Sequence, residues 1–289
     1  MTSFLIFPAV LPLRLTFADG YRLQASASVV GTNDLLTATH VLYQPQHGGW
    51  ATGLALLGTQ VAADGQIGLT GEATPIDGWQ VWANPQQVYA DNDPATLTLG
   101  ESQYDVALIG VNRLLDRTGL TLADHAVARQ GSGLGYAGGQ HLSGIDTGLQ
   151  HGQDGYSVWG STDSQLGPGS SGGPLLDASG QIIGVNSAGT PGSATWWADI
   201  GPFLPQLTQQ MQANDGLLQA TGPFQAGPLQ VSTGTTLPDL PAAGQETVVP
   251  QLPNALTVGG EARVNSTTQG DQWNPAVSAL ADGGYVVTW

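Results

Sequence analysis

Glycine and the near absence of good helix formers constrain this chain more than any other feature of its sequence. Of its 289 residues 42 are Gly, four are Glu and none is Lys. Lys and Glu stabilise exposed helices, whereas Gly weakens a helix by about 1 kcal/mol relative to Ala. Because 40% of the residues are still hydrophobic, enough apolar side chains remain to form a core. The composition therefore predicts a folded protein built mainly of strands and turns.

The pattern of apolar residues indicates an all-β first domain over residues 1–221. Residues 13–112 and 120–200 contain many short strand-like stretches separated by turn signals. The continuous apolar run 106–111 is typical of a strand buried on both faces. Many short strands predict a β-barrel or β-sandwich. One helix is predicted at 203–214, where four apolar residues share a face, namely Phe203, Leu204, Leu207 and Met211.

Residues 222–289 differ in character from the first domain. Residues 222–254 contain six prolines among Gly, Thr, Gln and Ala, which predicts an extended linker. Residues 255–289 return to a strand pattern, with a hairpin predicted around Asp282-Gly283-Gly284. A segment this short cannot bury a core of its own. We therefore expect 255–289 to be the first part of a larger β-module.

Charge and cysteine content exclude several kinds of function. The formal net charge is −16, and all six basic residues are Arg. Phosphate binding needs clusters of Lys and Arg, so nucleic acid is not an expected partner, and neither is an anionic membrane. No apolar run reaches 18 residues, so no membrane-spanning helix is expected. The absence of Cys excludes disulfides, thiolate metal sites and cysteine nucleophiles.

No cofactor or metal is predicted. The stretch Asp91-Asn92-Asp93 has carboxylates that suit calcium, but a solvated turn is the better interpretation.

The segment Gly169-Ser170-Ser171-Gly172-Gly173-Pro174 is the most informative motif in the chain. A nucleophilic serine needs a tight turn, room for the substrate, and backbone N–H groups directed at the oxyanion that forms during the reaction. Glycines on both sides of Ser171 supply the unusual dihedrals and the space. A Gly/Ser surface loop is the plain alternative, and in so glycine-rich a chain the motif alone does not exclude it.

Two further residues complete a possible catalytic set. His40 follows the apolar strand 35–39, and Asp105 directly precedes the buried-type strand 106–111. Taken singly, a histidine such as His40 is more often a surface or satisfied residue than a catalyst, and Asp105 is equally well interpreted as a turn residue that caps a strand. A carboxylate buried beside a strand needs a partner that offsets its loss of solvation. In order along the chain, His40, Asp105 and Ser171 provide a base, a group that orients the base, and a nucleophile.

The order of these residues along the chain distinguishes between the known folds of serine hydrolases. The sequence Gly-x-Ser-x-Gly also fits the nucleophile elbow of α/β-hydrolases, but that fold places its histidine after the serine. All five histidines of this chain precede Ser171. The subtilisin order would need Asp19 or Asp34 before His40, in an α/β fold that the all-β pattern does not support. The order His, Asp, Ser is that of the chymotrypsin-like fold.

The three motifs around these residues resemble the signatures of trypsin-like serine proteases of the cysteine-free bacterial type. They are Thr37-Ala38-Thr39-His40, Asp105-Val106-Ala107-Leu108 and Gly169-Ser170-Ser171-Gly172-Gly173-Pro174. The resemblance covers residues 13–215. It implies two six-stranded antiparallel β-barrels, at 13–112 and 120–200, followed by a C-terminal helix, with the site between the barrels. It also implies a serine endopeptidase that acts on peptides or proteins through an acyl-enzyme.

The resemblance also implies a role for each matching residue. His40 would be the general base, Asp105 would orient it, and Ser171 would be the nucleophile. The N–H groups of Gly169 and Ser171 would form the oxyanion hole. The substrate would be bound by four residues, Gln165, Ser187, Ala188 and Gly189, the first of which is uncharged and so does not favour Arg or Lys substrates. We expect Trp196 and Trp197 to lie in the core.

The C-terminal segment suggests a cellular context. Residues 270–289 resemble the start of β-repeats found in large bacterial exoproteins exported by type I secretion. The implied location is extracellular, and the type I secretion machinery is a possible partner. The alternative function is a catalytically silent trypsin-like module that serves binding or adhesion within a larger exoprotein. The intact set of three residues argues against silence.

Overall fold

The computed structural model describes residues 9–124, 128–161, 166–190, 194–219, 228–232, 240, 248–250, 276–279 and 285–288. The chain forms two compact units, Met1–Asn254 and Ala255–Trp289. Within the described residues, none of the helices has the length and apolar content needed to cross a membrane.

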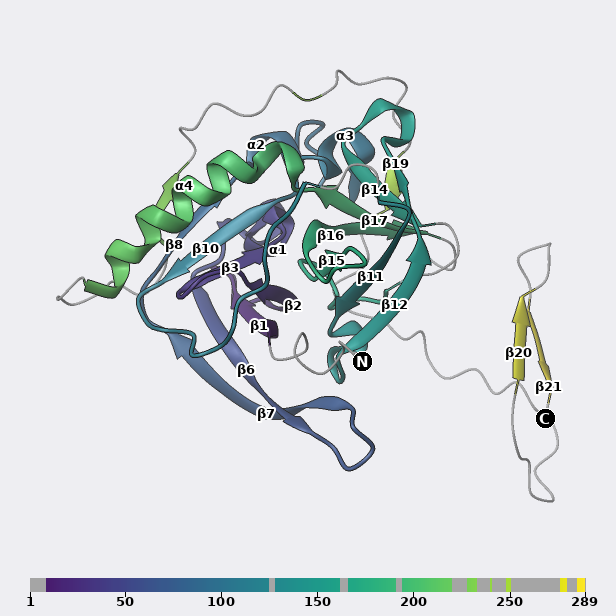
Figure 1. Ribbon diagram of the computed structural model, residues 1–289, viewed down its shortest axis with the longest axis horizontal. Helices are drawn as coiled ribbons and strands as arrows, with labels where there is room; N and C mark the ends of the chain where they lie inside the picture. Colours follow the sequence, from purple (N-terminus) through teal and green to yellow (C-terminus); the bar gives the residue numbers. More distant parts are fainter. Residues whose placement is uncertain are drawn as a thin grey trace. The chain divides into compact units, whose positions relative to one another are not determined.

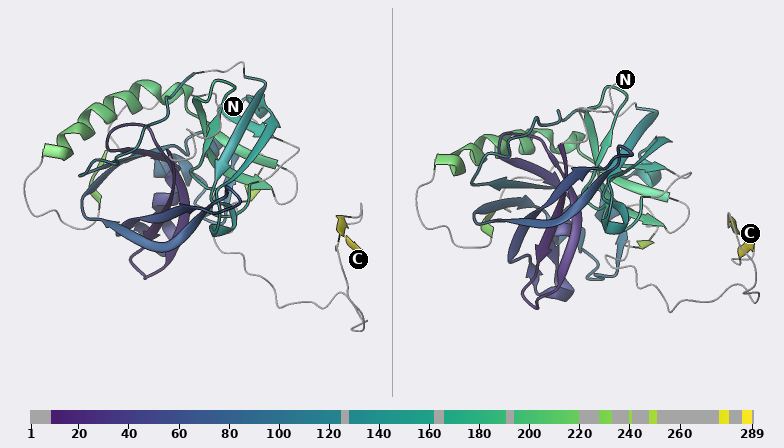
Figure 2. Two further views of the ribbon diagram at one scale, coloured as in Figure 1. Left: turned by 60° about the horizontal axis from the view of Figure 1, so that its bottom comes forward. Right: turned by 90° about the horizontal axis from the view of Figure 1, so that it is seen from below.

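Two large sheets, both mostly antiparallel, form most of the first unit (Figure 1). The first has the order β18-β8-β10-β3-β2-β1-β6-β7. Its strands are β1 (Val10–Thr16), β2 (Arg22–Val29), β3 (Asp34–Thr37), β6 (Gly53–Val61), β7 (Ile67–Ile76), β8 (Trp79–Ala83), β10 (Ala107–Val111) and β18 (Pro228–Ser232). Figure 2 (left) shows these strands curling around a common axis. Buried Leu11, Leu13 and Leu15 on β1 help to fill the core of this sheet.

The second sheet has the order β12-β11-β15-β16-β17-β14-β13. Its strands are β11 (Gln130–Gly135), β12 (Ser143–Gly148), β13 (Gln150–His151), β14 (Val158–Ser161), β15 (Pro174–Leu176), β16 (Ile182–Thr190) and β17 (Ala194–Asp199). Trp196 and Trp197 on β17 are buried in apolar clusters, as predicted. The sheets thus hold eight and seven strands, where six were expected in each barrel; the mostly β architecture is as predicted.

Short helices and strands lie between the strands of the first sheet and after the second sheet. The helices are α1 (Thr39–Leu42), α2 (Pro85–Val88), α3 (Leu99–Ser102) and α4 (Leu204–Asn214). The remaining short strands of this unit are β4 (Tyr43–Gln44), β5 (Gly49–Trp50), β9 (Thr96–Thr98) and β19 (Val248–Pro250). The predicted helix at 203–214 is confirmed as α4, and its predicted apolar face packs on the core of the first sheet. The predicted buried strand is confirmed as β10, which is buried at every position.

Part of the predicted linker pairs with the sheets rather than remaining unpacked. Strand β18 runs parallel to β8, and β19 runs antiparallel to β9. The edges of β8 and β9 offer free backbone groups, which explains why an extended proline-containing segment can attach there. The boundaries at residues 221 and 254 remain predictions.

In the second unit, the predicted hairpin is confirmed. Strand β20 (Ala276–Ala279) pairs antiparallel with β21 (Tyr285–Thr288). The turn residues 282–284 lie outside the described residues.

A buried carboxylate joins α4 to the first sheet. Asp34 opens β3, is 2% exposed, and accepts a hydrogen bond of 2.6 Å from Asn214 Nδ2 at the end of α4. Burial raises the pKa of Asp34 from 3.8 to about 6. The hydrogen bond from Asn214 lowers this pKa and the charge of Asp215 raises it, but both effects are smaller than that of burial.

Replacing this carboxylate should change how stability depends on pH. The folded state holds the Asp34 proton more tightly than the unfolded chain does, so ionised Asp34 destabilises the fold above pH 6. This penalty fades as the pH falls from 6 to 4. In denaturant unfolding, Asp34→Asn should therefore gain stability relative to the parent as pH rises through this window, by up to about 3 kcal/mol. Parallel pH profiles for the two proteins would contradict the assignment.

Candidate active site

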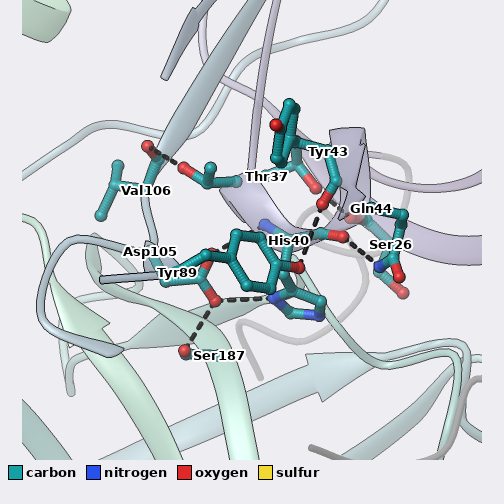
Figure 3. A network of polar contacts seen from close by, with 10 residues as sticks. Ser26, Thr37, His40, Tyr43, Gln44, Tyr89, Asp105, Val106 and Ser187 are labelled. Carbon is teal, nitrogen blue, oxygen red and sulfur yellow. Dashed lines mark hydrogen bonds and ion pairs between the residues drawn. The ribbon is translucent and has the colours of Figure 1, made fainter. Parts of the chain in front are cut away.

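The pairing of β3 with β10 brings two of the predicted site residues together. Thr37 lies opposite Ala107 in this antiparallel pair. Continuing the register places Asp105 opposite Thr39, at the end of β3 where α1 begins. Thr39 Oγ1 donates to the carbonyl oxygen of Val106 over 2.9 Å and fastens this end of the pair. The one-turn helix α1 then directs the His40 side chain at the Asp105 carboxylate (Figure 3).

Asp105 is completely buried, and its carboxylate accepts three hydrogen bonds. Oδ1 accepts from the backbone N–H of His40 over 2.9 Å. Oδ2 lies 2.6 Å from His40 Nδ1 and also accepts from Ser187 Oγ over 2.6 Å. With Nδ1 facing the carboxylate, the proton-bearing tautomer at Nδ1 leaves the other ring nitrogen, Nε2, as an acceptor. His40 is 3% exposed, so this pair is largely shielded from solvent.

A β-bulge directs Ser187 toward Asp105. On β16, Asn186 lies opposite Trp197 and Ala188 lies opposite Trp196, so Ser187 is the extra residue between two cross-strand pairs. Bulges commonly redirect a side chain next to a functional site. Ser187 was predicted to bind substrate; the structure shows in addition that its hydroxyl binds the carboxylate. Its position one residue after Asn186 carries no sequence signal for that contact.

The loop of Ser171 packs directly against the segment that precedes His40. A Cβ added to Gly172 would lie 2.0 Å from Thr37 Oγ1 and 3.1 Å from the backbone nitrogen of Ala38. Only glycine allows this approach, and the φ of +79° at Gly172 also favours glycine. The loop of Ser171 is thereby packed against the residues that precede His40, and within the described residues the Ser171 hydroxyl makes no hydrogen bond. Catalytic hydrogen bonds are often loose until a substrate is bound.

Ser26 on β2 fastens the Ser171 loop to the first sheet, a role that the sequence analysis missed. Its N–H donates to the carbonyl oxygen of Ser171 over 2.8 Å, and its hydroxyl donates to that of Gly169 over 2.9 Å. The same hydroxyl accepts from the N–H of Tyr136, and the Ser26 carbonyl accepts from Thr37 Oγ1. A small polar residue inside a buried strand was the only available signal.

The two predicted oxyanion-hole donors are the backbone N–H groups of Gly169 and Ser171. Gly169 has a φ of +92°, and its carbonyl is turned toward Ser26. In the part of the chain that the structure describes, neither the N–H of Gly169 nor that of Ser171 donates a hydrogen bond. Both N–H groups are therefore unpaired, as donors to an oxyanion must be before a substrate binds.

The other predicted substrate residues are only partly described. Ala188 and Gly189 lie on β16 next to Ser187, where one edge of the strand pairs with β17. Strand β15 pairs with the other edge of β16 only as far as Val185. Gln165 lies outside the described residues. The structure therefore brings His40, Asp105 and Ser187 together and packs the loop of Ser171 against the segment before His40, while the catalytic roles remain predictions.

Among the surface hollows of the first unit, one of about 570 Å³ lies beside β4, β5 and α2 and is lined by aromatic and proline side chains, among them Tyr43, Trp50 and Tyr89. A larger hollow, of about 1000 Å³, is lined by none of the predicted site residues.

The stretch Asp91-Asn92-Asp93 is a turn, as predicted. Asp91 and Asp93 each accept a hydrogen bond from the backbone N–H group two residues further on.

A known protein family matches more than half of the chain. The family model of the trypsin-like peptidase domain matches residues 25–185, a span that includes His40, Asp105 and Ser171. No curated protein matches the chain.

Solved structures show the same fold at low sequence identity. Protease Anisep from Arthrobacter nicotinovorans is 20% identical, with a TM-score of 0.52 over 71% of this chain and 96% of that chain. A scabies mite inactivated protease paralogue is 14% identical, with a TM-score of 0.54 over 73% and 97%. The fold is thus found in a protease and in a protein named as inactivated, so the fold alone does not decide activity.

The close approach of Gly172 can be tested with a matched pair of variants. Gly20→Ala introduces a side chain at a similar positive φ but with no atom within 4 Å, so it should cost about 1–2 kcal/mol of unfolding free energy. Gly172→Ala must also displace Thr37 and should cost roughly 3–5 kcal/mol. Equal losses in thermal or denaturant unfolding would contradict the tight packing between the two segments.

Proposed function

This chain belongs to the family of proteins with a trypsin-like peptidase domain, and we propose that it is a serine endopeptidase acting on peptides or proteins. The observation that carries this proposal is the buried His40–Asp105 pair, with 2.6 Å between Nδ1 and Oδ2, beside the loop of Ser171. A buried imidazole oriented by a carboxylate, with its second nitrogen free, is the base that a serine nucleophile requires.

The proposed reaction follows from these positions. Ser171 Oγ attacks the scissile carbonyl carbon while His40 Nε2 takes the hydroxyl proton. The resulting oxyanion accepts hydrogen bonds from the N–H groups of Gly169 and Ser171. His40 then gives its proton to the leaving amine, and an ester between Ser171 and the acyl part remains. Water, deprotonated by His40, hydrolyses this ester and restores the free enzyme. Asp105 stabilises the imidazolium in both halves of the reaction.

The free edge of β16 is the proposed binding site for the substrate backbone. Beyond Asn186, whose backbone bonds Gly172 and Gly173, this edge has no strand partner in the described part of the chain. Extended peptides commonly bind by adding a strand to such an edge. Residues Ser187, Ala188 and Gly189 lie there, next to the His40–Asp105 pair. We interpret the two sheets as the two barrels of the chymotrypsin-like fold.

The location of the protein is a separate proposal. The acidic, lysine-free and cysteine-free composition, together with the β-repeat resemblance of residues 270–289, supports an extracellular enzyme exported by type I secretion. Detection of the chain in the medium of its native host, lost when its type I exporter is deleted, would test this.

Labelling of the nucleophile is the direct test of the proposed function. A fluorophosphonate probe should label the parent protein at Ser171 and fail to label Ser171→Ala. Ser170→Ala is the matched control, because the Ser170 hydroxyl is occupied by the carbonyl oxygen of Gly167 and should not be needed for labelling. Peptide hydrolysis should fall by about 10⁴–10⁶-fold in Ser171→Ala or His40→Ala, with circular dichroism unchanged.

The same experiment distinguishes the alternative function. A folded parent protein that no fluorophosphonate labels would be a silent binding module rather than an enzyme. Peptidase activity that survives in purified Ser171→Ala would exclude Ser171 as the nucleophile.

A further inference from the structure

The side chain of Asn186 is a buried polar group without a partner beside the proposed nucleophile. Asn186 is 0% exposed, and both Oδ1 and Nδ2 lack a hydrogen bond. Its backbone, in contrast, is fully engaged with the loop of Ser171. The N–H of Asn186 donates to the carbonyl oxygen of Gly173 over 2.8 Å, and its carbonyl accepts from the N–H of Gly172 over 2.9 Å. The unpaired amide is therefore held within two residues of Ser171.

Because of the bulge at Ser187, the side chains of Asn186 and Ser187 point in different directions. Ser187 points at Asp105, whereas Asn186 lies directly opposite Trp197 in a regular cross-strand pair. Side chains opposite each other in a pair share one face of the sheet. The indole Nε1 of Trp197 is also buried without a hydrogen bond. One face of the sheet thus carries, at Asn186 and Trp197, two donor groups and one acceptor that nothing in the described part of the chain satisfies.

We propose that Asn186 determines the substrate specificity of this enzyme by hydrogen-bonding the side chain of the residue that contributes the scissile carbonyl. The inference rests on the proposed endopeptidase function. The carbonyl carbon of that residue must meet Ser171 Oγ, so its own side chain leaves the reaction centre within a few ångströms of Ser171. Buried polar groups in proteins are almost always paired, and an unpaired one at such a position is explained by a partner that the substrate supplies.

The chemistry of the unpaired atoms selects a primary amide, the side chain of Gln or Asn. Its carbonyl oxygen accepts from Asn186 Nδ2 and Trp197 Nε1, and its NH₂ group donates to Asn186 Oδ1. A carboxylate would leave Oδ1 unpaired and would bury a charge, and no Arg is among the buried residues of the described chain. Lys or Arg side chains would bury a positive charge with equally little compensation. An aliphatic side chain would leave all the polar atoms of the site unpaired.

Matched peptides that differ only at this residue test the proposal. The parent protein should cleave after Gln or Asn with a kcat/KM about 10–100-fold above that for Leu, Glu or Lys. Asn186→Leu keeps the shape of the side chain but removes its polar atoms, so the ratio of Gln to Leu should fall by a similar factor. Asn186→Leu should also unfold at an equal or higher temperature than the parent, because it removes an unsatisfied polar group.

Ser28→Ala is the control for stability. Ser28 Oγ is likewise buried without a hydrogen bond, but it lies on β2 of the first sheet. This variant should match Asn186→Leu in stability while keeping the parent ratio of Gln to Leu cleavage. If Asn186→Leu does not fold, Asn186→Ala offers the same comparison of peptides.

The outcomes separate this inference from the proposed function. Fluorophosphonate labelling of Ser171 reports the function in every variant. Labelling with an unchanged Gln to Leu ratio in the Asn186 variants overturns the specificity role and leaves the function standing. A parent protein that labels but favours Leu, Glu or Lys over both amides also overturns it. No labelling of the folded parent refutes the proposed function itself.

Discussion

A buried carboxylate is the constraint on which the site depends. Asp105 has no exposed surface, so its charge is tolerable only when donors surround it. Those donors come from both halves of the first unit. The N–H and Nδ1 of His40 reach it from α1, at the end of a strand in the first sheet, and Ser187 Oγ reaches it from β16 in the second. Satisfying one carboxylate therefore both orients the imidazole and ties the two sheets together where the reaction would occur.

The rest of the site follows from the close approach between the sheets. Ser26 donates hydrogen bonds to the carbonyl oxygens of Gly169 and Ser171 and so fastens this loop to the first sheet. Gly172 lets the loop press against Thr37 and Ala38. These contacts hold the loop before any substrate arrives. Preorganised donors of this kind act without reorganisation during the reaction.

Polar groups in this interior fall into two kinds. Asp105 and Asp34 are buried but hydrogen-bonded, and they join elements that are distant in the chain. Asn186 is buried and unpaired in a segment whose backbone is fully bonded, so it contributes nothing evident to the fold. The same fold occurs in a protein named as an inactivated paralogue, so the fold alone does not decide activity.

The sequence by itself determined the strand-rich architecture and the C-terminal helix α4, and it nominated His40, Asp105 and Ser171 as candidates, because composition, periodicity and motif order are local properties of the chain. It did not reveal Ser26, the Ser187 contact or the unpaired Asn186. Ser26 contacts residues up to 145 positions away, through hydrogen bonds whose partners have no fixed spacing. Nor could it reveal that part of the predicted linker adds strands β18 and β19, since any extended segment can pair with an open edge. Only the tertiary structure decided which buried polar groups find partners, because that depends on which distant segments meet.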